Sequence, residues 1–376
     1  MGVKRGIVEA VVSMLSTFAD AHACVEPKSI FVLRNNDIGD LLVITPLFEA
    51  LRRLFPKSEI VVGIGKWNLP VVDGNPNIDR ALSINAPWHN KNCCTFAHNS
   101  ARGFFESMRY ILASREVEAL RRCRFDVGID VLGSVEGSVL LMKAGIPFRL
   151  GVKGYAGGHS AMQRCVPFSA DEHVGRSSLR FAELLGARIL PECRPQIFLS
   201  SKERLEGEAS WSPRVKKSRR IVIGPGGGNA EKCWPRDNFI HLIRQLAELP
   251  CVEIAIVGGR GDRAAGAECA KGAPNVNNRA GDFSLRQTFA TVACADLVVC
   301  NSSMLMHAAA AFSIPEIVML GEGFPSAEQH ARQWGYESNC WICGKAADRD
   351  SIWSPSEVLE LIASMAVRPT GEMSAF

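Results

Sequence analysis

The chain has 376 residues, of which 47% are hydrophobic and 22% are charged, and its formal net charge is +4. This length suits two domains, and the composition is that of a globular protein rather than a disordered one. So small a positive charge argues against a dedicated nucleic-acid-binding protein. The 13 cysteines are odd in number and scattered, which excludes a dense secreted disulfide framework and favours reduced thiols.

Residues 1–26 are expected to form an amphipathic helix. Polar residues recur at helical spacing along one side, at Glu9, Ser13, Ser16 and Asp20. We favour a helix packed on its own domain. A helix lying in a membrane interface and a cleaved signal peptide stay open as alternatives, because Lys4 and Arg5 precede the apolar run. No stretch approaches the roughly 20 apolar residues that a spanning helix needs.

A first α/β series is expected over residues 27–195. It comprises strands over 29–33, 59–64 and 126–131 and helices over 41–54 and 115–122. This alternation of strand and helix indicates a parallel sheet with crossover helices.

A proline-punctuated segment that ends in a basic cluster, residues 196–219, is interpreted as a linker. A second α/β series follows over 220–376. Its expected strands are 220–223, 252–257, 296–300 and 316–320, with a helix over 236–249. The fold prediction is therefore α/β, with two Rossmann-like domains that face each other across a cleft.

An acidic turn, Asp37-Ile38-Gly39-Asp40, follows the first strand. In open α/β sheets, ligands bind at the carboxyl ends of the strands, where this turn lies. Gly39 permits a tight turn, and Asp40 would stand at a helix N-terminus. Two roles for Asp40 stay open on spacing alone, a helix cap and a catalytic carboxylate.

A glycine-rich turn, Gly224 to Gly228, follows the first strand of the second series, and Lys232 comes shortly after it. Exposed backbone N–H groups around Gly226 and the lysine charge could hold a diphosphate. A plain flexible loop is the alternative. Neither the Walker A pattern nor Gly-x-Gly-x-x-Gly is present, which disfavours a dinucleotide oxidoreductase.

Two further groups are weaker candidates. Asn301, Ser302 and Ser303 end a strand and lead into a helix, a second anion-binding geometry, whereas His307 alone is more often structural. Cys340 and Cys343 form a lone Cys-x-x-Cys pair. A structural role is favoured over a redox pair, and no metal site is expected, since structural zinc needs four ligands.

Taken in order, these segments resemble glycosyltransferase family 9, the lipopolysaccharide heptosyltransferases. The matching segments are Val32-Leu33-Arg34, Ile38-Gly39-Asp40-Leu41-Leu42, Thr45-Pro46-Leu47, Ala50-Leu51-Arg52, Gly74–Asp79, Pro225-Gly226, Lys232–Pro235, Ala280-Gly281 with Ser284-Leu285, Ala295-Asp296-Leu297 and Asn301–His307.

The resemblance implies a GT-B fold with an N-terminal acceptor domain and a C-terminal nucleotide-sugar domain. It also implies an inverting transfer of heptose from ADP-heptose to a lipopolysaccharide-core or other glycolipid acceptor, without a cofactor or metal. A cytoplasmic protein, peripheral on the inner membrane, follows from it. Asp40 matches the general base. The donor-binding set implied by the resemblance is Gly226, Lys232, Asn301, Ser302, Ser303 and His307.

The chain departs from the family at the donor loop. Ser302 stands where the family has Asp, Met304 where it has Gly, and Cys233 where it has Arg. Losing a carboxylate that could bind sugar hydroxyls raises the alternative of a non-catalytic nucleotide-sugar binder. Transfer to a protein, as in the autotransporter heptosyltransferases with iron-binding cysteine clusters, is a second alternative, although Cys340 and Cys343 offer only two ligands.

Overall fold

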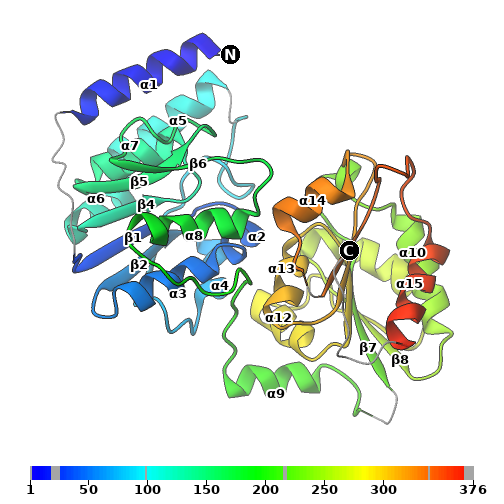
Figure 1. Cartoon of the computed structure of the whole chain (residues 1–376). Coiled ribbons are helices and arrows are strands. Elements are labelled where there is room, and N and C mark those ends of the chain that lie inside the picture. Colours follow the sequence, from blue (N-terminus) through cyan, green and yellow to red (C-terminus); the bar gives the residue numbers. More distant parts are fainter. Residues whose placement is uncertain (1, 18–25, 98–99, 215–217, 338, 368–376) are drawn as a thin grey trace. The chain divides into compact units, whose positions relative to one another are not determined.

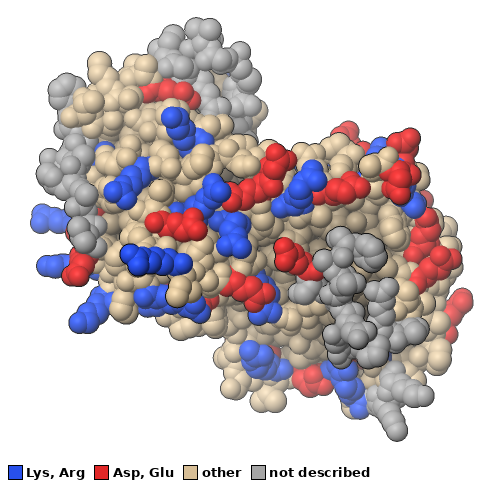
Figure 2. Space-filling view, in the orientation of Figure 1, with Lys and Arg blue, Asp and Glu red and all other residues tan. Residues whose placement is uncertain are grey.

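The computed structural model describes residues 2–17, 26–97, 100–214, 218–337 and 339–367. The chain divides into two compact α/β units, Met1–Cys193 and Arg194–Phe376 (Figure 1). On the face shown in Figure 2, basic side chains lie among acidic ones, in keeping with the small net charge.

Unit 1 contains a parallel sheet of six strands in the order β3-β2-β1-β4-β5-β6. The strands are β1 (Ser29–Leu33), β2 (Glu59–Ile64), β3 (Arg80–Ser83), β4 (Val127–Asp130), β5 (Phe148–Lys153) and β6 (Arg164–Pro167). The helices are α1 (Gly2–Ser16), α2 (Ile38–Leu42), α3 (Thr45–Leu54), α4 (Leu69–Val72), α5 (Ala101–Ala113), α6 (Arg115–Cys123), α7 (Val135–Lys143) and α8 (Val174–Leu184).

The central strand β1 is an uninterrupted apolar run, and its residues 30–33 are all fully buried. A strand buried on both faces reads this way because helices cover both sides of a parallel sheet. The single helix expected over 41–54 is two helices. α2 ends at Leu42 and α3 starts at Thr45, because Pro46 suits the first turn of a helix and not its interior.

The expected N-terminal amphipathic helix is α1, and it packs on α7. Val12 is buried against Val135 and Ala161, and Val8 lies beside them. Asp20, the last polar residue of the expected helix, lies outside the described residues. No helix in the described part of the chain is both long enough and apolar enough to cross a bilayer.

Unit 2 contains a second parallel sheet of six strands, in the order β12-β11-β10-β7-β8-β9. The strands are β7 (Arg219–Gly224), β8 (Val252–Ile256), β9 (Val276–Asn278), β10 (Leu297–Asn301), β11 (Glu316–Met319) and β12 (Cys340–Cys343). The helices are α9 (Ser201–Ala209), α10 (Arg236–Ala247), α11 (Arg263–Ala270), α12 (Leu285–Ala293), α13 (Met304–Ala311), α14 (Ala327–Trp334) and α15 (Pro355–Val367), with short 3₁₀ turns η2 (Ala230–Lys232) and η3 (Arg260–Asp262).

Both sheets have the same strand order relative to the chain, which is that of a Rossmann fold. In each sheet the first three strands are added toward one edge, and the fourth strand then pairs with the free side of the first. The resulting switch points lie between β1 and β4 in unit 1 and between β7 and β10 in unit 2. These are the positions at which open parallel sheets bind ligands.

The segment expected to be a linker, residues 196–219, contains α9, which packs on α12 within unit 2. A capping box between Ser200 and Glu203 starts this helix.

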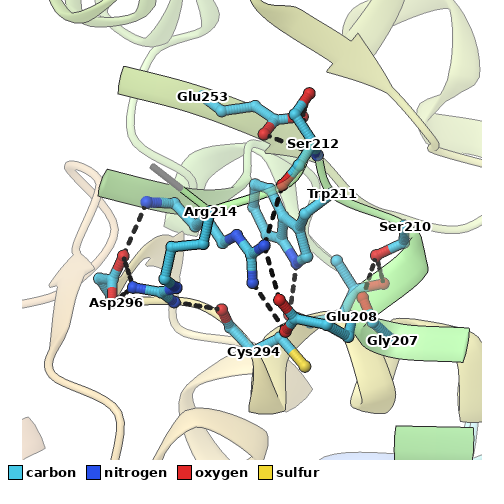
Figure 3. Close-up of polar contacts among 11 residues, drawn as sticks. Gly207, Glu208, Ser210, Trp211, Ser212, Arg214, Glu253, Cys294 and Asp296 are labelled. Atoms are coloured by element: carbon cyan, nitrogen blue, oxygen red, sulfur yellow. Dashed lines mark hydrogen bonds and ion pairs between the residues drawn. The ribbon is translucent and has the colours of Figure 1, made fainter. Parts of the chain in front are cut away.

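A buried arginine of β7, Arg220, connects that strand to Glu208 near the end of α9. Figure 3 shows Glu208 with its neighbours Trp211 and Ser212. Arg220, whose side chain is 2% exposed, makes two contacts of 2.8 and 2.7 Å with the carboxylate of Glu208 and donates to the carbonyl oxygen of Ser212 at 2.9 Å. Its guanidinium also lies over the ring of Trp211, at 5.8 Å.

We predict that Glu208→Ala destabilises unit 2 by about 1–3 kcal/mol, because a buried guanidinium loses its charged partner. Denaturant unfolding followed by tryptophan fluorescence measures this change. Glu206→Ala is the matched control on the same helix. Glu206 pairs with exposed Lys202, and such an exposed ion pair contributes less than about 1 kcal/mol to the free energy of unfolding. Equal effects of the two substitutions would contradict the structural role assigned to Arg220.

Candidate functional site

Asp40 lies at the switch point of unit 1, as the third residue of α2. Arg34, the first residue after β1, holds it in place. The Nη2 atom of Arg34 is 3.2 Å from Oδ1 of Asp40, and Nε donates to the Asp40 carbonyl oxygen at 3.1 Å. The Arg34 side chain is 6% exposed and that of Asp40 is 29% exposed. Asp40 is therefore fixed by a buried arginine while its carboxylate stays accessible.

Burial raises the pKa of Asp40, and the charge of nearby Asp37 raises it further. The positive charge of Arg34 opposes this rise. A carboxylate with a raised pKa is a stronger base than an ordinary aspartate, which suits it to accept a proton from a hydroxyl group.

The helix-cap alternative for Asp40 has some support. Asp37 is the N-cap residue of α2, and its side chain makes no capping hydrogen bond. A hydrogen bond between the Asp37 backbone and the Asp40 carboxylate acts on the Asp40 pKa, as in half of a capping box. Capping and proton transfer are compatible, because a carboxylate has two oxygens that accept hydrogen bonds.

A second carboxyl group, Asp130, stands at the end of β4, next to β1 in the sheet. It is fully buried, and its Oδ2 accepts the Ser134 backbone N–H at 2.9 Å. Burial raises the pKa of Asp130 to about 7, against the opposing charge of Arg34. The charge of Arg34 thus acts on two carboxyl groups, one in helix α2 and one at the end of β4. Asp130 was not among the expected site residues, although a charged residue at the end of an otherwise apolar strand was a signal for it.

Hydrogen bonds from segments later in the chain fix the turn that leads to α2. The carbonyl oxygen of Asn36 accepts hydrogen bonds from Trp67 Nε1 at 2.9 Å and Asn68 Nδ2 at 2.8 Å. Asp37 accepts the backbone N–H of Lys91 at 3.1 Å and is 3.3 Å from the lysine ammonium. A turn held on both sides keeps Asp40 in one position, as a general base requires.

In unit 2, Asn301 at the end of β10 connects the two expected donor loops. Its Nδ2 donates to the carbonyl oxygens of Pro225 at 2.8 Å and Gly226 at 3.2 Å, and its Oδ1 accepts the Trp234 backbone N–H at 2.8 Å. The side chain is 1% exposed. Its amide is engaged with backbone groups, so Asn301 orients the glycine-rich turn and the segment that carries Lys232.

Gly226 is closely approached by the side chain of Asp262. A Cβ atom at this position would lie 2.4 Å from the carboxylate of Asp262, which itself accepts the Gly259 backbone N–H at 2.8 Å. Asp262 follows β8 and was not among the expected site residues. An acidic residue after the second strand of a Rossmann unit is where the ribose of a nucleotide is commonly bound.

Lys232 ends η2 and is exposed. Its ammonium lies 5.5 Å from the ring centroid of Phe324. Burial, and then the charge of Lys232, lowers the pKa of His330 to about 4. Within the residues that the structure describes, no carboxylate forms an ion pair with Lys232. Its charge is therefore available for an anionic ligand.

The remaining expected donor residues lie at the start of α13. Ser303 is the N-cap, and its hydroxyl accepts the Leu305 backbone N–H at 3.3 Å. Ser302 is half-buried beside it. The Nδ1 atom of His307 is 2.6 Å from the hydroxyl of Tyr336, and the imidazole is 6% exposed. The structure thus brings these residues to one switch point with Asn301, while His307 is engaged with Tyr336.

Cys340 and Cys343 are the two ends of β12. Three residues of strand span about 10 Å, and side chains three positions apart point to opposite faces, so a disulfide between them is incompatible with this strand. Burial raises the pKa of both thiols. No group of three or more metal-binding side chains occurs in the described ranges. The structural interpretation of this pair is the one that the geometry favours.

Comparison with solved structures gives the same fold. The structure of Escherichia coli ADP-heptose lipopolysaccharide heptosyltransferase II matches with a TM-score of 0.69 and 20% identity, covering 90% of this chain and 98% of that one. E. coli heptosyltransferase WaaC, solved with ADP-2-deoxy-2-fluoro heptose, matches with a TM-score of 0.68 and 16% identity, covering 90% and 99%. The predicted α/β fold of the GT-B type is confirmed.

Comparison with known sequences identifies the family. Lipopolysaccharide heptosyltransferase 2 of Escherichia coli K12 is 23% identical over 322 residues, which cover 79% of this chain and 83% of that protein. Residues 114–348 match glycosyltransferase family 9 (heptosyltransferase). Because that match spans more than half of the chain, the chain belongs to glycosyltransferase family 9, and it is a heptosyltransferase-like glycosyltransferase.

Proposed function

We propose that this enzyme transfers heptose from ADP-heptose, with inversion, to a lipopolysaccharide-core or other glycolipid acceptor at the cytoplasmic face of the inner membrane. The observation that carries the proposal is Asp40, fixed by Arg34 at the switch point of unit 1 with a side chain that is still 29% exposed. The relatives named above are heptosyltransferases, and one was solved with an ADP-heptose analogue.

In this mechanism the acceptor hydroxyl attacks the anomeric carbon of the sugar. Its proton passes to the Asp40 carboxylate, and the bond between the anomeric carbon and the diphosphate oxygen breaks. The bonding electrons leave with ADP, so the negative charge on the diphosphate oxygens increases as ADP departs. Lys232 and the backbone N–H groups around Gly226 and Ser303 stabilise that charge.

The other unit 2 residues have supporting roles in the proposal. Asn301 positions both donor loops through the hydrogen bonds described above, and Asp262 accepts hydrogen bonds from the ribose. Ser302 and His307 line the donor side of α13. Because Lys232 has no carboxylate partner among the described residues, protein groups can supply the positive charge that the leaving diphosphate needs.

A non-catalytic nucleotide-sugar binder is the second candidate, and Ser302 is the residue that favours it. The family acid is missing there, which could abolish transfer while leaving nucleotide binding intact. The accessible base Asp40 serves no purpose in such a protein. Turnover therefore separates the two candidates.

For the base, we predict that Asp40→Asn lowers the rate of ADP release from ADP-heptose in the presence of acceptor by about two to four orders of magnitude. ADP affinity should change little, because Asp40 lies in unit 1. The unfolding temperature should fall somewhat, because buried Arg34 loses a charged partner, but the fold should persist since Asn keeps the size of the side chain and the backbone carbonyl that Arg34 also contacts. The matched control is Asp171→Asn, at an exposed aspartate of unit 1 outside the turn that carries Asp40, and it should retain the parent rate. Loss of only a few-fold at position 40 would leave Asp40 as a helix cap.

For the donor site, Lys232→Ala should weaken ADP binding by about 10- to 150-fold, the worth of a hydrogen bond to a charged group. Calorimetric titration with ADP measures the dissociation constant. Lys271→Ala removes another exposed lysine of unit 2 and should bind ADP as the parent does. Unchanged affinity in Lys232→Ala would remove this lysine from the donor site.

For sugar recognition, Ser302→Asp should tighten ADP-heptose binding by about 10- to 150-fold and leave ADP binding unchanged, because the new carboxylate accepts sugar hydroxyls. Competition between ADP and ADP-heptose measures both affinities. The control is Ser303→Asp, which preserves the helix cap and places the same charge one residue away. It should not tighten the binding of ADP-heptose. Equal weakening of both ligands by Ser302→Asp would show that position 302 faces the diphosphate.

A further inference from the structure

Helix α5 presents an unusual outer face in unit 1. Its inner face is buried through Gly103, Ser107 and Ile111. The opposite face carries four exposed residues, which we call the α5 stripe: Arg102, Phe105, Arg109 and Leu112. Phe105 is 70% exposed and Leu112 is 67% exposed. The stripe therefore alternates a cation with a large apolar side chain along one line of the helix.

Helical geometry explains why these residues share a face. They follow one another at intervals of three, four and three, so they lie one above the next on the helix surface. In the part of the chain that the structure describes, neither Arg102 nor Arg109 has a carboxylate partner. Glu106 lies one turn from each arginine and accepts a hydrogen bond from Thr95, but it forms an ion pair with neither of them. The two largest apolar groups of the stripe are in solvent.

Helix α1 also carries exposed apolar side chains. Its inner residue Val12 is buried against α7, while Val11, Met14 and Leu15 are 47%, 60% and 49% exposed. Both α1 and α5 pack on α7, so the two helices lie on the same side of the first sheet (Figure 1). Exposed apolar side chains of this size on two neighbouring helices are a mark of an interaction surface.

We propose that the α5 stripe, together with the outer row of α1, docks unit 1 on the surface of an anionic lipid bilayer. Phe105 and Leu112 would enter the boundary between headgroups and acyl chains, and the two arginines would bind lipid phosphates. Charge complementarity selects this occupant, because anionic headgroups supply the partners that Arg102 and Arg109 lack.

A second copy of the chain fits this face less well. In a symmetric contact, the same patch meets itself, so arginines would approach arginines. The alternation also leaves no continuous apolar centre of the kind found at stable protein interfaces. A lipid interface accepts both features at once, since apolar groups go in and cations stay at the phosphates. This inference rests on the membrane location given in the proposed function and names the surface that would provide it, but it does not depend on the donor site.

The test is co-sedimentation of the full chain with two kinds of vesicle. One contains phosphatidylethanolamine and anionic phosphatidylglycerol, and the other contains phosphatidylcholine alone. We expect binding to the anionic vesicles, weakened by added salt. Arg102→Gln with Arg109→Gln should lower the partition coefficient about 30-fold and reduce its salt dependence. Phe105→Ser with Leu112→Ser should lower it by at least about tenfold.

A matched control lies on α9 of unit 2, where Arg204 precedes Leu205, which is 71% exposed. Arg204→Gln with Leu205→Ser should bind vesicles as the parent does. All substituted side chains are exposed, so unfolding temperature and ADP affinity should match the parent, and a failure of ADP binding would count only against the proposed function.

Four results would overturn the docking proposal. These are no binding by the parent, equal binding to neutral vesicles, parent-like binding by both α5 double variants, or equal loss in the α9 control. A dimer of the parent in light scattering that disappears in Phe105→Ser with Leu112→Ser would instead assign this face to self-association.

Discussion

The parallel pairing of β1 with β4, and of β7 with β10, is the constraint on which both candidate sites depend. In the first pair, Leu33 lies opposite Asp130, and in the second, Gly224 lies opposite Cys300. At each pair the connections leave toward opposite faces of the sheet, so the loops diverge instead of filling the space above the strand ends. The two units present different groups at this position, a carboxylate in unit 1 and a glycine-rich turn in unit 2.

Each site combines a buried polar side chain that organises the loops with an exposed group that can meet a ligand. Arg34 and Asn301 have the first role, and both are almost entirely buried. Burying a polar group without a hydrogen-bond partner costs free energy. The hydrogen bonds that these two side chains make therefore also fix the conformation of the loops that provide their partners. Asp40 and Lys232 have the second role, because they stay accessible at the ends of the organised loops.

The departures from the family are confined to one part of this arrangement. Asp40, Gly226 and Lys232 are retained, whereas Ser302, Met304 and Cys233 differ. In the proposed mechanism the retained residues act on a proton and a diphosphate, which every nucleotide-sugar reaction of this kind shares. Ser302 stands beside the helix start at which a sugar could be recognised. A family member can therefore keep its chemistry while it changes the sugar that it selects.

The sequence by itself determined the central strands and the local motifs. The apolar runs of β1, β7 and β10 predict buried parallel strands, whereas the short, partly exposed edge strands β3 and β9 carry no comparable pattern. The turn before Asp40 and the glycine-rich turn were found because their signals are adjacent in sequence. The start of α9 had a local signal too, the Ser-x-x-Glu capping box at Ser200, which the prolines around it obscured.

Only the tertiary structure decided which side chains act together. Asp130 joins Arg34 through the pairing of two strands almost a hundred residues apart, and Asp262 meets Gly226 across β7 and β8. Asn301 was expected to contact a ligand, yet its amide holds backbone groups more than sixty residues earlier in the chain. Periodicity and local motifs report which face of an element is buried, but hydrogen bonds, burial and pKa depend on neighbours that folding alone brings together.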